Sequence, residues 1–292
     1  MRAKTLLIAV LILAGCASAP KPVEPPRLKA ALEAESDGAK RYGRGDYAVA
    51  ARRFDEAARI YASIDDTPGA ARNRLHLARS ELALGRAEAA LLTLQMVEWA
   101  ERSNEAGLAL DALLLKAQAQ LALDRGDAAQ QSLAAAASQC TGACPQAASL
   151  HLLQARAALA GSRAADALAH AETALKLLQG KDQAAETGNA WRLIAAARLA
   201  GGDLRGELGA ALPAAQAALE IDRQLALPEK IARDWLLIGD IQRKVGAGGT
   251  AAAYRRALDV ATAAGLADLA RLATQALAEL ESLQGQKSKR EN

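Results

Sequence analysis

The sequence predicts an all-α protein built from repeated helical hairpins. Alanine supplies 76 of the 292 residues and aromatic residues only 3%, while leucine provides most of the other apolar side chains. Alanine and leucine favour helices, whereas the β-branched and aromatic residues that favour strands are scarce. From residue 28 onward, stretches with helical apolar spacing alternate with short turns at a period of about 40 residues. These observations argue against β-sandwiches, β-barrels, parallel-sheet enzymes and a disordered chain.

The first fifteen residues have the pattern of an export signal. Two basic residues precede the apolar run 6–13, which is too short to span a membrane. The run ends in Leu-Ala-Gly followed by Cys16, and this resembles the lipobox of bacterial lipoproteins, where the signal is cut before a cysteine that carries diacylglycerol. We therefore expect residues 1–15 to be removed and Cys16 to be lipidated. The alternative is an ordinary secretory signal cut after Ala17 or Ala19.

The residues after the expected lipid anchor predict a tether close to the membrane. Ala17 stands where an aspartate would otherwise follow the cysteine, and the resemblance to bacterial lipoproteins then implies sorting to the periplasmic face of the outer membrane. Residues 16–27 contain four of the eight prolines and predict an extended segment that reaches roughly 30 Å. Without the signal the chain has 34 basic and 33 acidic side chains. It therefore lacks the strong basic field of a nucleic-acid-binding protein.

The other two cysteines predict a small disulfide. Cys140 and Cys144 lie four residues apart in a loop that also contains Gly142 and Pro145. Such a pair can be oxidised outside the cytoplasm, so we expect a disulfide, with two free thiols as the alternative. A metal site is not expected, because no further cysteine or nearby histidine completes a set of four ligands.

Six turns divide the predicted units into pairs of helices. We expect a glycine to end the first helix in left-handed geometry, and an aspartate or serine to cap the second. The turns lie at 44–46, 84–86, 125–127, 160–162, 201–203 and 245–249. Most other prolines fall between units, but Pro213 falls within one, and we expect a kink or a break of the helix there.

A small residue recurs in the first helix of every unit, at spacings of 40, 41, 36, 40 and 44 residues. These residues are Gly38, Ala78, Ala119, Ala155, Ala195 and Gly239. Together with Tyr47, Ala50, Phe54 and Ala57 in the second helix of the first unit, the pattern resembles the tetratricopeptide repeat. In that family a small residue at the eighth position marks where the two helices of a unit touch.

The resemblance covers about residues 30–264 and implies a right-handed solenoid of about six repeats. The period exceeds the usual 34 residues, so we expect each helix to be about one turn longer. The apolar spacing of residues 266–283 predicts a capping helix that covers the last repeat. The predicted organisation is a signal peptide at 1–15, a lipidated cysteine and tether at 16–27, a solenoid at 28–284 and a polar tail at 285–292.

Motifs that carry catalysis are absent from the sequence. It contains no H-E-x-x-H, no G-x-S-x-G and no phosphate-binding loop. The glycine-rich stretch 246–251 follows a predicted helix rather than a strand, so we interpret it as a turn. The three histidines lie on different predicted helices without ligand spacing, as expected for surface or groove residues. We therefore expect no enzyme, no cofactor and no metal ion.

A row of basic residues is the strongest candidate for a binding site. In tetratricopeptide repeats, the second, fifth, ninth and twelfth residues of each first helix line the concave wall. At these positions the only acidic side chains are Glu35 and Asp240. The basic ones are Arg72, Arg79, Lys116, Arg156, Arg192, Arg233 and Arg243. They predict a groove for an acidic or amphipathic segment of a protein partner. The alternative is a solvated face whose arginines pair with carboxylates on adjacent helices.

The sequence favours a scaffold that is anchored in the outer membrane and binds protein partners of the cell envelope. Its resemblance to repeat lipoproteins implies the assembly of pilus secretins, of outer-membrane proteins or of peptidoglycan, without a choice among them. The alternative is a structural subunit of a polysaccharide-export or secretion complex that contacts its neighbours through the convex face. A small-ligand receptor or an enzyme would need a deep enclosed pocket. No nucleic-acid partner is expected.

Overall fold

The computed structural model describes residues 25–97, 106–202 and 207–291, and these residues contain helices but no strand. The helices are α1 (Pro26–Gly43), α2 (Tyr47–Ser63), α3 (Thr67–Ala83), α4 (Ala87–Gln95), α5 (Ala106–Ala122), α6 (Gly126–Gln139), α7 (Ala147–Ala160), α8 (Ala164–Leu178), α9 (Ala184–Gly201), α10 (Glu207–Gln224), α11 (Pro228–Val245), α12 (Thr250–Ala263) and α13 (Ala267–Glu291). The predicted signal peptide, Cys16 and most of the tether lie outside these ranges. Within them, no helix is both long and apolar enough to cross a membrane.

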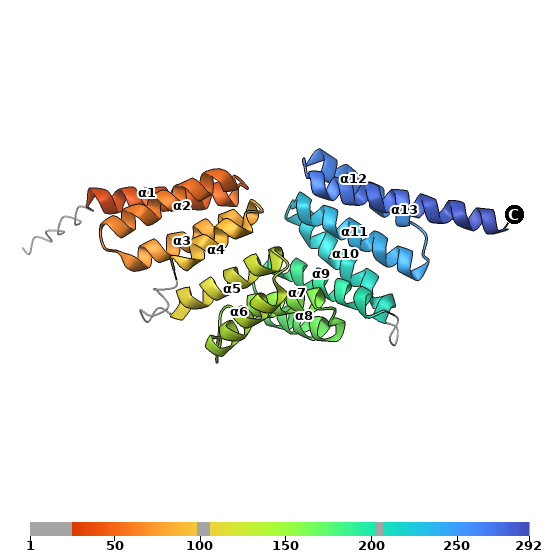
Figure 1. Cartoon of the computed structure of the whole chain (residues 1–292), viewed down its shortest axis with the longest axis horizontal. Coiled ribbons are helices and arrows are strands. Elements are labelled where there is room, and N and C mark those ends of the chain that lie inside the picture. The colour runs from red at the N-terminus through yellow and green to blue at the C-terminus, as the bar shows by residue number, and fades with distance from the viewer. Residues whose placement is uncertain (1–24, 98–105, 203–206, 292) are drawn as a thin grey trace, which may run out of the picture.

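The helices form six consecutive hairpins, from α1 with α2 to α11 with α12, and α13 packs on the last of them. The hairpins stack in chain order into an arch, with α5 to α8 in its middle and the two terminal hairpins at its ends (Figure 1). Each predicted turn lies at the junction between the two helices of one pair. The predicted all-α solenoid of about six repeats with a C-terminal helix is therefore confirmed.

The recurring small residues lie where the two helices of each hairpin touch, and all six are buried. A Cβ atom added to Gly38 would lie 2.8 Å from Cε1 of Phe54 in α2. A Cβ atom added to Gly239 would lie 2.5 Å from Cδ1 of Tyr254 in α12. Glycine in the first helix thus makes room for an aromatic ring in the second, and this lets the two helices pack closely.

The turns differ in detail from the expectation. The glycines of the first two turns have positive φ, as predicted. In the third and fourth turns, however, Asp124 and Ser162 take that conformation, with φ of 54° and 56°. Gly126 instead begins α6, and Gly161 has a negative φ. In these four turns the residue with positive φ is the second after the end of the first helix, whichever residue type stands there, because short polar side chains tolerate left-handed geometry. In the fifth and sixth turns, Gly202 and Gly246 follow the helix directly and have positive φ, as predicted.

The expected capping by aspartate or serine in these turns is also wrong where the structure shows the cap. Asp46 precedes α2, but its side chain accepts no hydrogen bond from the start of the helix. The cap occurs between two units instead, where Oδ1 of Asp66 accepts a hydrogen bond of 2.8 Å from the Gly69 amide of α3. Asp66 thus caps α3, whereas the residues that precede α7, α9 and α11 make no side-chain cap.

Three further boundaries differ from the prediction. Helix α1 begins at Pro26, inside the expected tether, because proline suits the first position of a helix. Helix α13 continues through the expected polar tail to Glu291. Pro213 lies inside α10 without breaking it: its own position is exposed, while Ala211 and Ala215 on either side are completely buried and hold the helix against its neighbours.

Candidate functional site

The odd-numbered helices form the inner wall of the solenoid. From α3 to α13, each of them contacts the next odd-numbered helix, whereas the even-numbered helices contact mainly the odd-numbered ones beside them. Successive layers are therefore closest on the odd-numbered side. The solenoid must curve toward that side, so its concave face is made by α3, α5, α7, α9 and α11. The seven basic residues predicted for the groove all lie on these helices.

At the N-terminal end of the wall, Arg72 is paired with a carboxylate of the preceding hairpin. Its Nε and Nη2 atoms donate to Glu35 of α1 at 2.9 and 3.2 Å, and the hydroxyl of Tyr61 donates to the same carboxylate at 2.8 Å. Burial alone would raise the pKa of Glu35, but the hydrogen bonds from Arg72 and Tyr61 outweigh it and lower that pKa. Burial and the Glu35 carboxylate raise the pKa of Tyr61 to about 12.

At the C-terminal end, two more arginines have carboxylate partners. Arg243 lies 3.4 Å from Asp240 on its own helix and 3.3 Å from Glu279 of α13. Arg233 pairs with Glu229, one turn away on α11, at 2.9 Å, and both side chains are more than half exposed. An exposed pair of this kind contributes little free energy, so Arg233 can exchange partners readily.

The structure assigns Arg192 a different role from the predicted one. Its side chain is only 17% exposed, and its guanidinium donates to Asp222 of α10 and to Asp234 of α11. These two aspartates are completely buried. Arg192 is therefore engaged inside the protein at the junction of the fifth and sixth hairpins, and it does not offer a free charge to a ligand in the groove.

Arg156 of α7 is the predicted groove residue that keeps its charge unpaired. In the described part of the chain it has no hydrogen bond and no ion pair. Its side chain is exposed, yet the surrounding wall removes part of its water, and this partial burial lowers its pKa, with a further lowering by the charge of Arg233. Of the other two, Arg79 contacts Nδ1 of His76 at 3.4 Å and Lys116 also has an interaction partner.

Leucines also occupy wall positions of the repeat register, between these arginines, and most of them contribute to the core. Leu75 and Leu152 are buried, and the others pack in part against core clusters. These partly buried leucines are Leu82, Leu113, Leu123 and Leu236. Both interpretations of the wall thus hold in part. Four arginines pair with carboxylates, and one unpaired arginine lies among partly covered apolar side chains.

The fold brings together two histidines, His151 and His170, whose sequence positions gave no sign of a contact. The Nδ1 atoms of His151 in α7 and His170 in α8 lie 3.1 Å apart, so one ring must carry its hydrogen there and the other must accept it. Burial lowers the pKa of His151, and the charge of His170 lowers it further. Their separation of 19 residues gives no periodic signal, since it spans two helices and a turn. Within the described ranges, no group of three or more potential ligands is placed to hold a metal ion.

The loop between α6 and α7 contains Cys140 and Cys144, which the structure joins in a disulfide with a Cα–Cα distance of 5.3 Å. Both cysteines pack in part against the core cluster that joins the third and fourth hairpins. In the same loop, Nε2 of Gln146 donates to Asp111 of α5 at 3.3 Å. The loop therefore fixes the path between the third and fourth hairpins.

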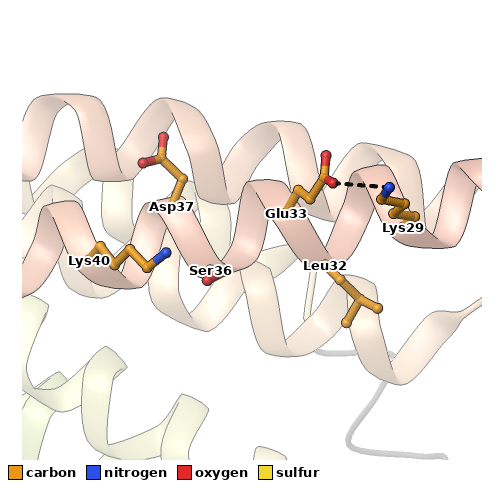
Figure 2. A pocket seen from close by; sticks show the side chains of 6 residues that line it. All are labelled: Lys29, Leu32, Glu33, Ser36, Asp37 and Lys40. Carbon is orange, nitrogen blue, oxygen red and sulfur yellow. Dashed lines mark ion pairs between the residues drawn. The ribbon is translucent and has the colours of Figure 1, made fainter.

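The open end of the solenoid has a shallow hollow on α1. Figure 2 shows its lining, which consists of six residues along this helix: Lys29, Leu32, Glu33, Ser36, Asp37 and Lys40. Lys29 lies 3.9 Å from Glu33, and Asp37 pairs with Arg41 and Arg53. Charges of both signs neutralise one another on this face. This face therefore suits the polar, solvent-exposed end of the solenoid rather than a ligand site.

Comparison with solved structures supports the fold. The crystal structure of the apo form of RapI matches with a TM-score of 0.62 and 14% sequence identity, over 88% of this chain and 72% of that chain. The TPR2AB domain of yeast Sti1 in its pHSP90 complex matches more distantly, with a TM-score of 0.37 and 14% identity, over 85% and 97% of the two chains. No protein-family model and no curated protein sequence matches the chain. The likeness to RapI supports the helical-repeat fold described above.

Proposed function

We propose that this protein is a lipid-anchored scaffold that binds a segment of a protein partner on its concave face. It works at the periplasmic face of the bacterial outer membrane, in the assembly of the cell envelope. A helical-repeat fold supports the binding role, because such solenoids present an extended concave surface to partners. The lipobox-like sequence before Cys16 supports the anchor.

The observation that carries this proposal is the unpaired guanidinium of Arg156 on the inner wall. A guanidinium offers a planar fork of donors that matches a carboxylate. The positive charge of Arg233 acts on Arg156. Arg233 pairs with Glu229, an exposed glutamate one turn away, so the donors of Arg233 are also accessible. We therefore propose that an acidic segment of the partner binds where these two arginines from α7 and α11 face the same part of the wall.

The test of the groove is crosslinking in living cells with a tagged protein, followed by identification of the captured proteins. We expect a dominant envelope partner, and we expect Arg156→Glu to reduce its yield at least tenfold. Arg59→Glu is the matched control, because Arg59 is an exposed arginine on α2 whose carboxylate partner lies one turn away. Equal capture by both variants would contradict binding at Arg156. Arg72 and Arg192 are unsuitable for this test, since their loss would leave buried or half-buried carboxylates unpaired.

The anchor is tested by changing the expected lipidation site. Cys16→Ser is expected to move the protein from the membrane fraction to the soluble fraction, because no acyl chains would be attached. Fractionation with immunoblotting measures this, and the size of the band reports whether the signal has been removed. A processed Cys16→Ser chain that stays in the membrane would contradict the lipid anchor.

A second candidate function has its own observation. Leu92 lies on α4, an even-numbered helix of the convex side, and Met96 is the residue that directly follows this helix; they are 63% and 54% exposed. An exposed apolar pair of this kind suits contact with another subunit, as in an export or secretion complex. If the crosslinked partner is lost in Leu92→Ser/Met96→Ser but kept in Arg156→Glu, this second function is favoured.

A further inference from the structure

Two buried carboxylates share one arginine at the junction of the fifth and sixth hairpins. Asp222 lies near the end of α10 and Asp234 lies in α11, and neither side chain is exposed at all. Arg192 of α9 donates from Nε to Asp234 Oδ1 at 2.5 Å, and its Nη2 contacts both Asp234 Oδ2, at 3.4 Å, and Asp222 Oδ2. Because one nitrogen serves oxygens of both carboxylates, the two carboxylates must be adjacent.

The two negative charges of this pair are not both neutralised by cations in direct contact with them. Arg192 of α9 and Lys230 of α11 are the charged groups that act on the two aspartates, and Glu186 of α9 acts in turn on Lys230. Lys230 is half-buried, and its Nζ lies 3.5 Å from a backbone carbonyl, Ala185 O, rather than against either aspartate. One bonded cation therefore serves two carboxylates that have no access to water. Repulsion between two adjacent buried anions favours a proton on one of them.

One oxygen of the pair also lacks a donor. Oδ1 of Asp222 is buried and has no hydrogen-bond partner. Gly188 of α9 closes the space on one side, since a Cβ atom there would lie 3.1 Å from this oxygen. A buried acceptor without a donor is costly, and the adjacent carboxyl of Asp234, once protonated, is a donor within reach. A single proton would thus both satisfy Asp222 and remove the repulsion.

We infer that Asp222 and Asp234 bind one proton between them in the folded protein, and that this proton strengthens the contact among α9, α10 and α11. This inference does not depend on the proposed function. It makes the junction of the last two hairpins respond to pH. Burial raises the pKa of Asp234 to about 6 from its ordinary value of 3.8, and the charge of Asp222 adds to this rise against the opposing effect of Arg192.

The sign of the pH effect follows from these values. Between about pH 4 and pH 6 the folded protein holds a proton that the unfolded chain releases, so the free energy of unfolding increases as the pH falls through this range. Asp234→Asn removes the titrating group and keeps the shape of the side chain. We expect the ratio of the unfolding constants of this variant and the parent to rise about tenfold between pH 7.5 and pH 5. The ratio cancels other titrating groups, such as the histidines.

The measurement is urea unfolding at both pH values, followed by tryptophan fluorescence in a Trp99→Phe background. The remaining tryptophans, Trp191 and Trp235, lie in α9 and α11 and report on this junction. Asp259→Asn is the matched control, since Asp259 is an exposed aspartate on α12 and its variant should show a ratio independent of pH. A ratio for Asp234→Asn that is also independent of pH would overturn the inference.

A direct titration keeps the inference testable if Asp234→Asn does not fold. Carbon-13 labelling of the aspartate carboxyl groups lets nuclear magnetic resonance follow their protonation in the parent protein. We expect one buried carboxyl to titrate near pH 6, with a second signal that shifts in the same range because the proton is shared. Titration of every aspartate below pH 5 would overturn the inference.

Discussion

Replacing Arg192 with methionine is expected to lower the free energy of unfolding of the C-terminal hairpins by about 3–5 kcal/mol at pH 7.5. Methionine keeps much of the length and packing of the side chain but removes the guanidinium. Asp222 and Asp234, both fully buried, would then lose their bonded cation. An uncompensated buried charge is among the most destabilising changes that a single substitution makes. Urea unfolding at pH 7.5, followed by the fluorescence of Trp191 and Trp235, measures the loss.

Two further variants separate the buried charge from a general effect of losing an arginine. Arg233→Met removes an exposed arginine from α11 and should change the free energy of unfolding by no more than about 0.5 kcal/mol. Combining Arg192→Met with Asp222→Asn and Asp234→Asn should recover most of the lost stability, because no buried charge remains. A similar loss of stability in Arg192→Met and Arg233→Met would mean that the contacts of Arg192 with Asp222 and Asp234 do not stabilise the fold.

Gly239→Ala is expected to lower the free energy of unfolding by about 1–3 kcal/mol, although alanine normally favours a helix. The added Cβ would lie 2.5 Å from Cδ1 of Tyr254, a ring that is completely buried. The ring has little freedom to move away, because its hydroxyl donates to Asp240 at 2.7 Å. Thermal unfolding monitored by circular dichroism measures the effect.

Gly209→Ala is the control for Gly239→Ala, since Gly209 is exposed on α10 and a Cβ there meets nothing within 4 Å. It should stabilise the protein by up to about 1 kcal/mol. The second hairpin suggests a second substitution that restores stability. There Ala78 stands at the position of Gly239, and it packs in one cluster with Leu94, which stands at the position of Tyr254. Adding Tyr254→Leu to Gly239→Ala should therefore restore part of the loss. Destabilisation by Gly209→Ala of the same size would contradict the steric explanation.

The fold could be predicted because its rule is local and repeated. The small residue in each first helix and the turn that follows recur at nearly constant spacing, and the structure places both at the contacts within each hairpin. The exact residue in left-handed geometry could not be predicted for Asp124 and Ser162. It depends on where the preceding helix ends, and helix ends shift by one residue at little cost.

The sequence could predict which residues lie on the inner wall, but not which of its arginines pair with carboxylates. The repeat register placed Arg156 and Arg192 on the same kind of position, yet one is unpaired and the other is bound to two aspartates. Their difference depends on Asp222, which belongs to the second helix of its hairpin and reaches the wall only through the packing of α10 between α9 and α11. Glycine at position 188, opposite that aspartate, was the available signal, because it leaves room for a buried carboxylate.

Among the described residues, each hairpin makes its extensive contacts with the hairpins next to it, so the two ends of the stack are joined through the layers between them. Layers of helices lie about 10 Å apart, so the first hairpin lies roughly 40 Å along the stack from the junction of α9 and α11. By this geometry alone, a rotation of about 5° at that junction corresponds to a displacement of roughly 3 Å at the far end. The width of the arch is therefore sensitive to the packing angle between any two layers, including the layers joined at Asp222 and Asp234.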